Sequence, residues 1–139
     1  MTSEYTNPLP TPTPDTQNFW DGLKEQTIQL KRCTEKECGR FHHFPRSICP
    51  YCHSTNLEWT PVSGNGTLYA FSVNHRPPRG WTENEAPVIA IIELEEGIKL
   101  YTNLVNPPDD PTSIKIGVPV EPVFDKVTDE VTLLRYRLK

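Results

Sequence analysis

The sequence predicts a mainly β protein with an N-terminal arm, a short helix, a four-cysteine ribbon and a five-stranded barrel. Three observations support this fold class. Four cysteines lie within twenty residues, fifteen prolines limit the helix content, and apolar residues after the cysteines mostly recur with period two. A chain of 139 residues is long enough for one domain, or for a small module attached to a medium one. We divide it into residues 1–17, 18–32, 33–57 and 58–139.

The first segment, residues 1–17, is predicted to be an extended arm. Four of its residues are prolines at alternating positions: Pro8, Pro10, Pro12 and Pro14. This spacing favours an extended, solvated backbone and is incompatible with a helix. The arm is either a flexible tail or a strap that becomes ordered on a partner.

Within residues 18–32 the sequence predicts a short helix followed by a strand. Asp15 or Thr16 can cap the helix. One helical face then carries three large apolar side chains, Phe19, Trp20 and Leu23. A helix this short is unstable alone, so we expect these three residues to bind a partner protein. The following residues change to period two, with Ile28 and Leu30 on one face of a strand that leads into the cysteines.

The cysteines form two pairs, Cys33 with Cys38 and Cys49 with Cys52, and ten residues separate the pairs. A hairpin of that length brings both pairs to one point. Four thiolates complete the tetrahedral coordination of one zinc ion and leave no open position, so the site is expected to be structural, as in a rubredoxin-like ribbon. Two disulfides are the alternative, which the lack of secretion features disfavours. His53 could replace one cysteine, although four thiolates already suffice.

Five short strands are expected after the ribbon, at residues 64–75, 87–94, 98–105, 118–125 and 130–138. The absence of a long helix between them favours a small, partly open barrel. The five-stranded oligonucleotide/oligosaccharide-binding (OB) fold matches in strand count and size. A β-sandwich remains the alternative, because periodicity does not distinguish the two.

Three of these strands carry more detailed expectations. In the first, Tyr69, Phe71 and Val73 are expected on the face opposite Leu68 and Ala70. The second is nearly continuously apolar, which is typical of a strand buried on both sides. The fourth contains two prolines, which require an edge, a strand end or a bulge.

Several stretches together resemble the acyl-CoA-associated zinc-ribbon/OB-fold family, which was long classed as a domain of unknown function. The similarity runs from about Phe19 to the C-terminus. It is carried by FWDGL, CGRFHHFPRSICPYCHS, HRPP, PVIAIIELEEGIKLYTNLV and DEVTLLRYR. The FPR between the cysteine pairs and the HRPP after the first barrel strand are the more specific motifs. The wide loop between Cys33 and Cys38 departs from the usual pattern without changing the number of ligands.

The resemblance implies an accessory role. Members of this family are partners of thiolase-superfamily enzymes that make or cleave carbon–carbon bonds in CoA thioesters, such as benzoylsuccinyl-CoA thiolase and steroid side-chain aldolases, and others accompany hydratases. Their catalytic residues lie in the large subunit. The chain is therefore expected to form a hetero-oligomer with a thiolase-fold large subunit, with the CoA thioester at the subunit boundary.

The residues themselves offer no catalytic group. The cysteines are assigned to metal, which removes the best nucleophile. Three histidines, His42, His43 and His53, lie in or beside the ribbon, where solvated or turn positions are expected. His75 could act as a base but has no evident partner. We therefore expect no catalytic residue in this chain.

Four residues are candidates for CoA contact: Arg46, Arg76, Arg79 and Trp81. The arginine fork matches two phosphate oxygens, and a tryptophan ring offers a flat face to adenine. The alternative is that these residues belong to a solvated rim of charges.

Composition limits the other function classes. Zinc ribbons and OB barrels also occur in nucleic-acid-binding modules, which is the alternative function. A net charge of −4 gives no overall attraction to nucleic acid. No stretch has the length of a membrane span, and the N-terminus lacks a signal pattern, so we expect a cytoplasmic protein.

Overall fold

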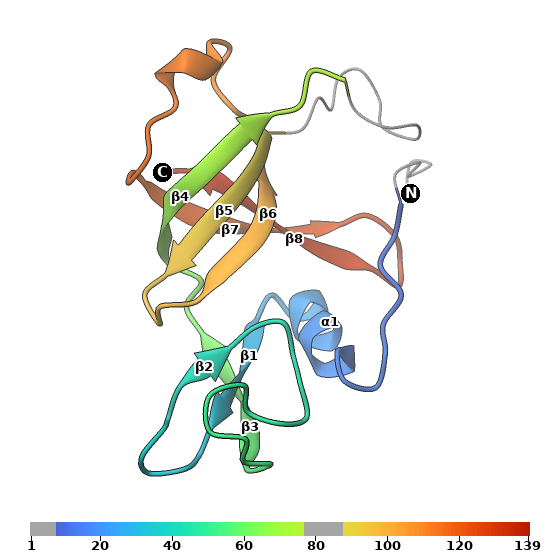
Figure 1. The fold of residues 1–139 in the computed structure, drawn as a ribbon. Coiled ribbons are helices and arrows are strands. Elements are labelled where there is room, and N and C mark those ends of the chain that lie inside the picture. Colours follow the sequence, from blue (N-terminus) through green and yellow to red (C-terminus); the bar gives the residue numbers. More distant parts are fainter. Residues whose placement is uncertain (1–7, 77–87) are drawn as a thin grey trace.

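The computed structural model describes residues 8–76 and 88–139, which form a small sheet and a barrel with one short helix between them (Figure 1). In chain order the elements are α1 (Gln17–Lys24), β1 (Ile28–Cys33), β2 (Phe41–His42), β3 (Leu57–Val62), β4 (Gly66–Val73), β5 (Val88–Leu94), β6 (Lys99–Leu104), the 3-10 turn η2 (Pro111–Ser113), β7 (Pro119–Lys126) and β8 (Thr132–Leu138).

The small sheet belongs to the ribbon and has the order β2-β1-β3, with all pairs antiparallel. β1 pairs with β3 from Ile28 opposite Val62 to Cys33 opposite Leu57. The alternation predicted for β1 is confirmed, because Ile28 and Leu30 are buried on one face. β1 therefore delivers the first cysteine to the ribbon while its apolar face packs into the core.

The barrel is closed, with the order β4-β5-β6-β8-β7. This confirms the five-stranded OB fold and excludes the sandwich. The closure is tighter than the partly open barrel we expected: β6 meets β8 in parallel at Leu104, and β4 meets β7 at two positions. Pro119 stands at the start of β7, and Pro122 lies beyond the short β4 ladder. Pro119 therefore occupies a strand end, as predicted, whereas Pro122 lies opposite Tyr136 within the β8 ladder and is unpaired only on the side toward β4.

The faces of β4 differ from the prediction. A register shift between Leu68 and Ala70 leaves Tyr69 as an extra residue opposite β5. Such a bulge shifts the alternation by one residue. Leu68 and Phe71 consequently pair with inward-facing residues of β5, whereas Tyr69 points outward and is half exposed. The prediction that Tyr69 shares a face with Phe71 and Val73 is therefore wrong.

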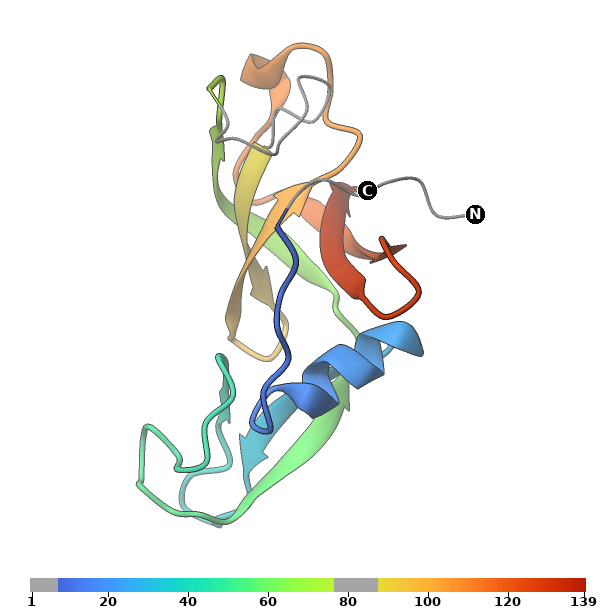
Figure 2. The same cartoon turned by 90° about the vertical axis from the view of Figure 1, so that its right-hand side faces the viewer.

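Helix α1 lies between the ribbon and one end of the barrel (Figure 2). Leu23 is fully buried and Phe19 is 7% exposed, and both join the same core as β1 and the barrel. This corrects the prediction that Phe19, Trp20 and Leu23 all bind a partner, because two of them are already covered by this chain. Trp20 remains half-buried at the surface. Thr16 holds the N-cap position, but its hydroxyl bonds to Thr13 instead of to the helix.

The joint between ribbon and barrel is built around Gly64. The buried Tyr136 hydroxyl donates a 2.8 Å hydrogen bond to the Gly64 carbonyl. Gly64 has φ +84°, and a Cβ atom there would lie 2.7 Å from Cδ1 of Ile28. The chain therefore passes from β3 to β4 through a crowded site, where Ile28 of β1 and Tyr136 of β8 lie against Gly64.

The described part of the chain buries only one face of β5. Val88, Ala90, Ile92 and Leu94 point into the barrel and are buried. Ile89, on the outer face, is 46% exposed. The expectation of a strand covered on both sides is thus not met among the described residues. No helix in residues 8–76 and 88–139 has the length and apolar character needed to cross a membrane.

Candidate metal centre and apolar groove

The four cysteine sulfurs meet at one point in the ribbon. All four lie within 4.8 Å of one another, with 3.5 Å between Cys33 and Cys52 and 3.8 Å between Cys38 and Cys49. Four thiolates around one zinc ion at about 2.3 Å lie about 3.8 Å apart, whereas disulfide sulfurs are about 2.05 Å apart. The cysteines are free thiols in the geometry of a tetrahedral metal site. The predicted pairs are therefore brought together, and His53 is not part of this group.

Backbone turns shape the two loops that carry the sulfurs. The Cys38 N–H donates to the Glu35 carbonyl, and the His53 N–H donates to the Cys49 carbonyl. His53 has φ +65°, so it makes the turn of the second loop instead of serving as a ligand. The Glu35 carboxylate accepts a 2.9 Å hydrogen bond from Ser54, which ties the two loops together. The sulfurs are thus positioned by the loops themselves.

The thiols differ in their acidity. Burial raises the pKa of Cys49, but backbone N–H donors in its loop outweigh burial and lower that pKa to about 7. The N–H of Ser54 lowers the pKa of Cys52, but burial and the neighbouring sulfurs outweigh it and raise that pKa to about 12. Adjacent thiolates repel one another, so the group cannot ionise fully alone. A divalent cation would remove this penalty, which fits a metal site.

An apolar groove of about 490 Å³ lies where the ribbon, α1 and the barrel meet. Its walls come from all three parts: Phe19 and Trp20 of α1, His43 and Phe44 of the ribbon, residues 99–103 of β6, and Leu133 and Leu134 of β8. Phe44 is 58% exposed and Tyr101 is 83% exposed at the rim. This groove was not predicted from the sequence. The alternation in β6, which puts Tyr101 on the outer face, was a signal that could have revealed one wall.

His43 is an uncharged part of the groove wall. Its ring packs 5.1 Å from the ring of Phe19 and 5.5 Å from that of Phe44, measured between centroids. Burial, and to a lesser extent His42, lowers the pKa of His43 to about 4, so the imidazole is neutral at physiological pH. His42 is 3% exposed. The expectation of a solvated or turn position is therefore wrong for His42, which is buried in β2, whereas His43 lies at a bend after β2 and is half-buried.

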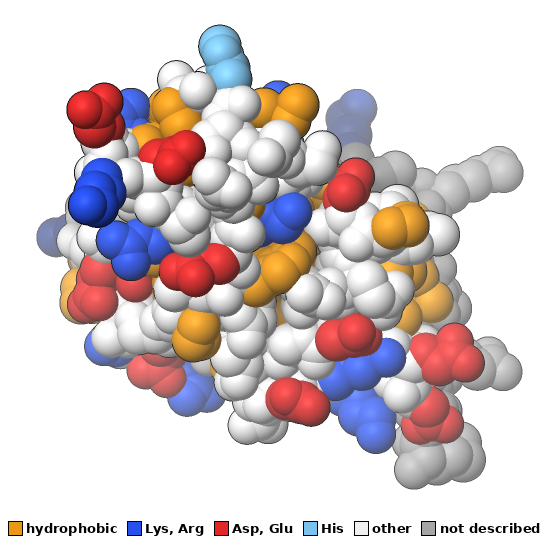
Figure 3. All heavy atoms as spheres, turned by 90° about the horizontal axis from the view of Figure 1, so that it is seen from below, with side chains coloured by type: hydrophobic (Ala, Val, Ile, Leu, Met, Phe, Trp, Pro, Cys, Tyr) orange, Lys and Arg blue, Asp and Glu red, His pale blue; other side chains and the backbone are white. Residues whose placement is uncertain are grey.

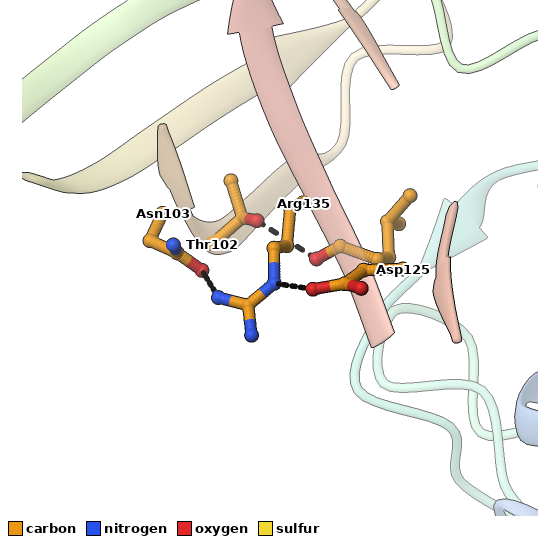
Figure 4. A network of polar contacts seen from close by, with 5 residues as sticks. Thr102, Asn103, Asp125 and Arg135 are labelled. Carbon is orange, nitrogen blue, oxygen red and sulfur yellow. Dashed lines mark hydrogen bonds and ion pairs between the residues drawn. The ribbon is translucent and has the colours of Figure 1, made fainter. Parts of the chain in front are cut away.

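A network of polar contacts joins the strands beside the groove (Figure 4), whereas the buried Nδ1 of His43 has no hydrogen-bond partner among the described residues. Arg135, which is 8% exposed, donates from Nε to Asp125 at 2.6 Å and from Nη1 to Asn103 at 3.0 Å. The Thr102 hydroxyl donates to the Leu134 carbonyl at 2.9 Å. These bonds join β6, β7 and β8 and hold the polar side chains of the wall in place.

The two CoA candidates that the structure describes do not lie in one cluster. Arg46 is exposed in the ribbon loop after β2, and Arg76 is exposed just beyond the end of β4. Arg79 and Trp81 lie outside the described residues. The loop that follows β2 and the far end of β4 lie toward opposite ends of the molecule (Figure 1), and β4 alone spans about 26 Å. A single phosphate cannot reach both.

Two family descriptions together match most of the chain. Residues 20–58 match "ChsH2, rubredoxin-like zinc ribbon domain", and residues 59–125 match "ChsH2, C-terminal OB-fold domain". A solved structure, "Ltp2-ChsH2(DUF35) aldolase", superposes with a TM-score of 0.81 and 32% identity, covering 94% of this chain and 98% of that one.

Two curated relatives have similar length. A DUF35 domain-containing scaffold protein of Methanocaldococcus jannaschii is 36% identical, with 80% of this chain and 77% of the relative covered. Benzoylsuccinyl-CoA thiolase subunit BbsA of Thauera aromatica is 28% identical, with 100% and 99% covered. A probable enoyl-CoA hydratase alpha subunit of Thermomonospora curvata is 34% identical over 86% of this chain, which spans only 36% of that relative's length.

Proposed function

We propose, because this chain belongs to the ChsH2 (DUF35) family of zinc-ribbon/OB-fold proteins, that it is a non-catalytic subunit of a thiolase-superfamily complex that makes or cleaves carbon–carbon bonds in CoA thioesters. Its tasks in that complex are assembly and contribution to the binding of the CoA thioester. The likeness along almost the full length of an aldolase chain is the observation that carries the proposal. The relatives named as thiolase and hydratase subunits support it.

The residues fit a supporting role better than a catalytic one. The four cysteines are held together by their loops, and His43 is packed among aromatic rings. We infer that Cys33, Cys38, Cys49 and Cys52 bind one structural zinc ion. A zinc ion with four thiolate ligands has no open position for substrate, so it would stabilise the ribbon without taking part in the reaction.

Co-expression with the products of the neighbouring genes tests the proposal, which expects a thiolase-superfamily large subunit among them. We expect the two chains to co-purify with fixed stoichiometry and to elute as one complex in size-exclusion chromatography with light scattering. The large subunit alone should lose activity. Independent elution of two fully active proteins would contradict the proposal.

The contribution to CoA binding predicts an effect of Arg76→Ala on the assembled enzyme. Arg76 is exposed, so its replacement should leave the fold intact. Loss of a charged hydrogen bond to a CoA phosphate is expected to raise KM about tenfold while kcat stays nearly constant, because a phosphate far from the reacting carbon is held equally in ground and transition states.

Steady-state kinetics of the reconstituted complex measures this effect. Arg46→Ala serves as the comparison, because Arg46 lies in the ribbon loop after β2 and Arg76 beyond the far end of β4, too far apart to contact the same phosphate. Unchanged kinetics in both variants would assign these arginines to a solvated rim. A fall in kcat with unchanged KM would instead indicate a role in catalysis.

The alternative, a nucleic-acid-binding module, is less well supported. Such modules present a continuous basic surface with exposed aromatic residues. Seen from the ribbon end, acidic and basic side chains are interspersed (Figure 3). The chain as a whole carries a net charge of −4. The described residues on that face therefore form no basic stripe that could bind a phosphate backbone.

A further inference from the structure

We propose that the partner subunit docks on one continuous apolar surface formed by the groove and the outer face of the β4–β6 sheet. This inference rests on the proposed function and specifies which face of the chain the large subunit covers. We call it the aromatic face and define it by six residues: Trp20, Phe44, Tyr69, Ile89, Ile91 and Tyr101.

The aromatic face runs from the groove across β6 and β5 to β4, where Ala70, the neighbour of Tyr69, lies opposite Ile91. The ion pair of Lys99 and Glu93 borders it beside Tyr69. Ile91 of β5 lies opposite Tyr101 of β6, and Ile89 lies opposite Asn103. Tyr101 also lines the groove, where Trp20 and Phe44 form the opposite walls. Of the six residues, Tyr101, Phe44, Tyr69 and Ile89 are at least 46% exposed. Monomeric proteins rarely leave apolar residues clustered in this way, and such patches mark interaction sites.

The sequence of β5 indicates that this surface is normally covered. Val88–Leu94 reads Val-Ile-Ala-Ile-Ile-Glu-Leu, an almost unbroken apolar run. Such runs are typical of strands buried on both faces. The barrel interior accounts for one face, but Ile89 remains exposed on the other. A protein surface laid across β5 would bury this second face.

Charge and hydrogen bonding specify the chemistry of the occupant. Lys99 is the one charged side chain among the described residues that line the groove; it pairs with Glu93 at 3.6 Å and lies 4.6 Å above the Tyr69 ring. The Thr102 hydroxyl and the Asn103 Oδ1 are already bonded within the chain, and His43 is neutral and offers one buried nitrogen without a partner. An occupant would therefore gain little from phosphate or other charged groups. The surface suits an uncharged apolar patch on the large subunit, with one or two side chains inserted into the groove.

Substitutions of Tyr101 test this surface, because its 83% exposure makes the fold insensitive to the change. Tyr101→Ser removes apolar contact, and Tyr101→Arg in addition places a charge in the interface. For the purified large subunit, we expect isothermal titration to give Kd values at least about 10-fold and 100-fold weaker, respectively. Phe44→Ser should also weaken binding at least about 10-fold.

Tyr51→Ser and Tyr51→Arg are the matched controls. Tyr51 is an exposed tyrosine of the ribbon, but it lines a different hollow beside Gly97. These variants should change Kd by less than about threefold. Equal weakening by the Tyr51 and Tyr101 variants would overturn the assignment of this face.

Failure of the inference and failure of the proposed function are distinguishable. If the wild-type chain binds the large subunit and Tyr101→Arg binds equally well, only the docking face is wrong. If the wild-type chain does not bind, the proposed function falls and the inference with it. Sedimentation of the free chain, alone and with neutral phosphatidylcholine vesicles, tests for two other occupants of the face. A homodimer that Tyr101→Arg dissociates would overturn the proposal. Vesicle binding that Tyr101→Arg abolishes would also overturn it.

Discussion

Replacement of Cys49 by serine is expected to abolish metal binding and to unfold the ribbon. Cys49 is fully buried, and its sulfur lies 3.8 Å from that of Cys38. Metal binding in small zinc modules is worth on the order of 10 kcal/mol of folding free energy. Since β1 shares one core with α1 and the barrel, we expect the loss to weaken the whole chain.

The measurement combines metal analysis with thermal unfolding of protein purified under reducing conditions. Wild type should contain one zinc ion per chain, and Cys49→Ser should contain none. His53→Asn is the control: asparagine tolerates the positive φ of this position, so zinc should be retained. Zinc retained by Cys49→Ser, or a wild type with four cysteines in disulfides and no zinc, would contradict the assignment of the ligands.

Gly64→Ala is expected to destabilise the protein by about 2–5 kcal/mol. A left-handed conformation costs an L residue about 1–2 kcal/mol, and overpacking a filled site adds about 1–3 kcal/mol. At Gly64 the new methyl group would lie 2.7 Å from Ile28 and 3.0 Å from Pro122. It would also lie 3.4 Å from the Tyr136 hydroxyl that bonds to the Gly64 carbonyl.

Gly97→Ala separates the conformational cost of the substitution from the cost of overpacking. Gly97 has φ +85°, close to that of Gly64, but no atom of the described residues lies within 4 Å of the position that a methyl group would take there. Its replacement should therefore cost only the conformational part, about 1–2 kcal/mol. Urea denaturation of the zinc-loaded variants measures the difference. Equal losses at the two glycines would mean that the joint between ribbon and barrel is not crowded in solution.

A crowded joint matters for the proposed function, because it would keep the ribbon and the barrel in one orientation. The groove takes its walls from α1, the ribbon and the barrel, so its shape depends on that orientation. A change at Gly64 is therefore expected to weaken partner binding as well as stability. Loss of the zinc site is likewise expected to weaken partner binding, because that site holds the loop from which Phe44 reaches the groove.

Local patterns in the sequence predicted much of this protein. Two cysteine pairs with short spacing are held close by the chain itself, so the sulfur cluster could be anticipated. The period-two alternation predicted β1, and Pro119 was correctly expected at a strand end. These features depend on neighbours within a few residues, and the covalent chain already determines those neighbours.

Other features were decided by the tertiary structure alone. One inserted residue at Tyr69 shifted the faces of β4, α1 was buried by its own chain, and Arg46 and Arg76 were placed toward opposite ends. The groove exists only because α1, the ribbon loop and two barrel strands converge. The sequence by itself determined which residues are apolar and where strands run. Which apolar residues the chain covers, and which it leaves to a partner, depends on long-range packing that no local pattern records.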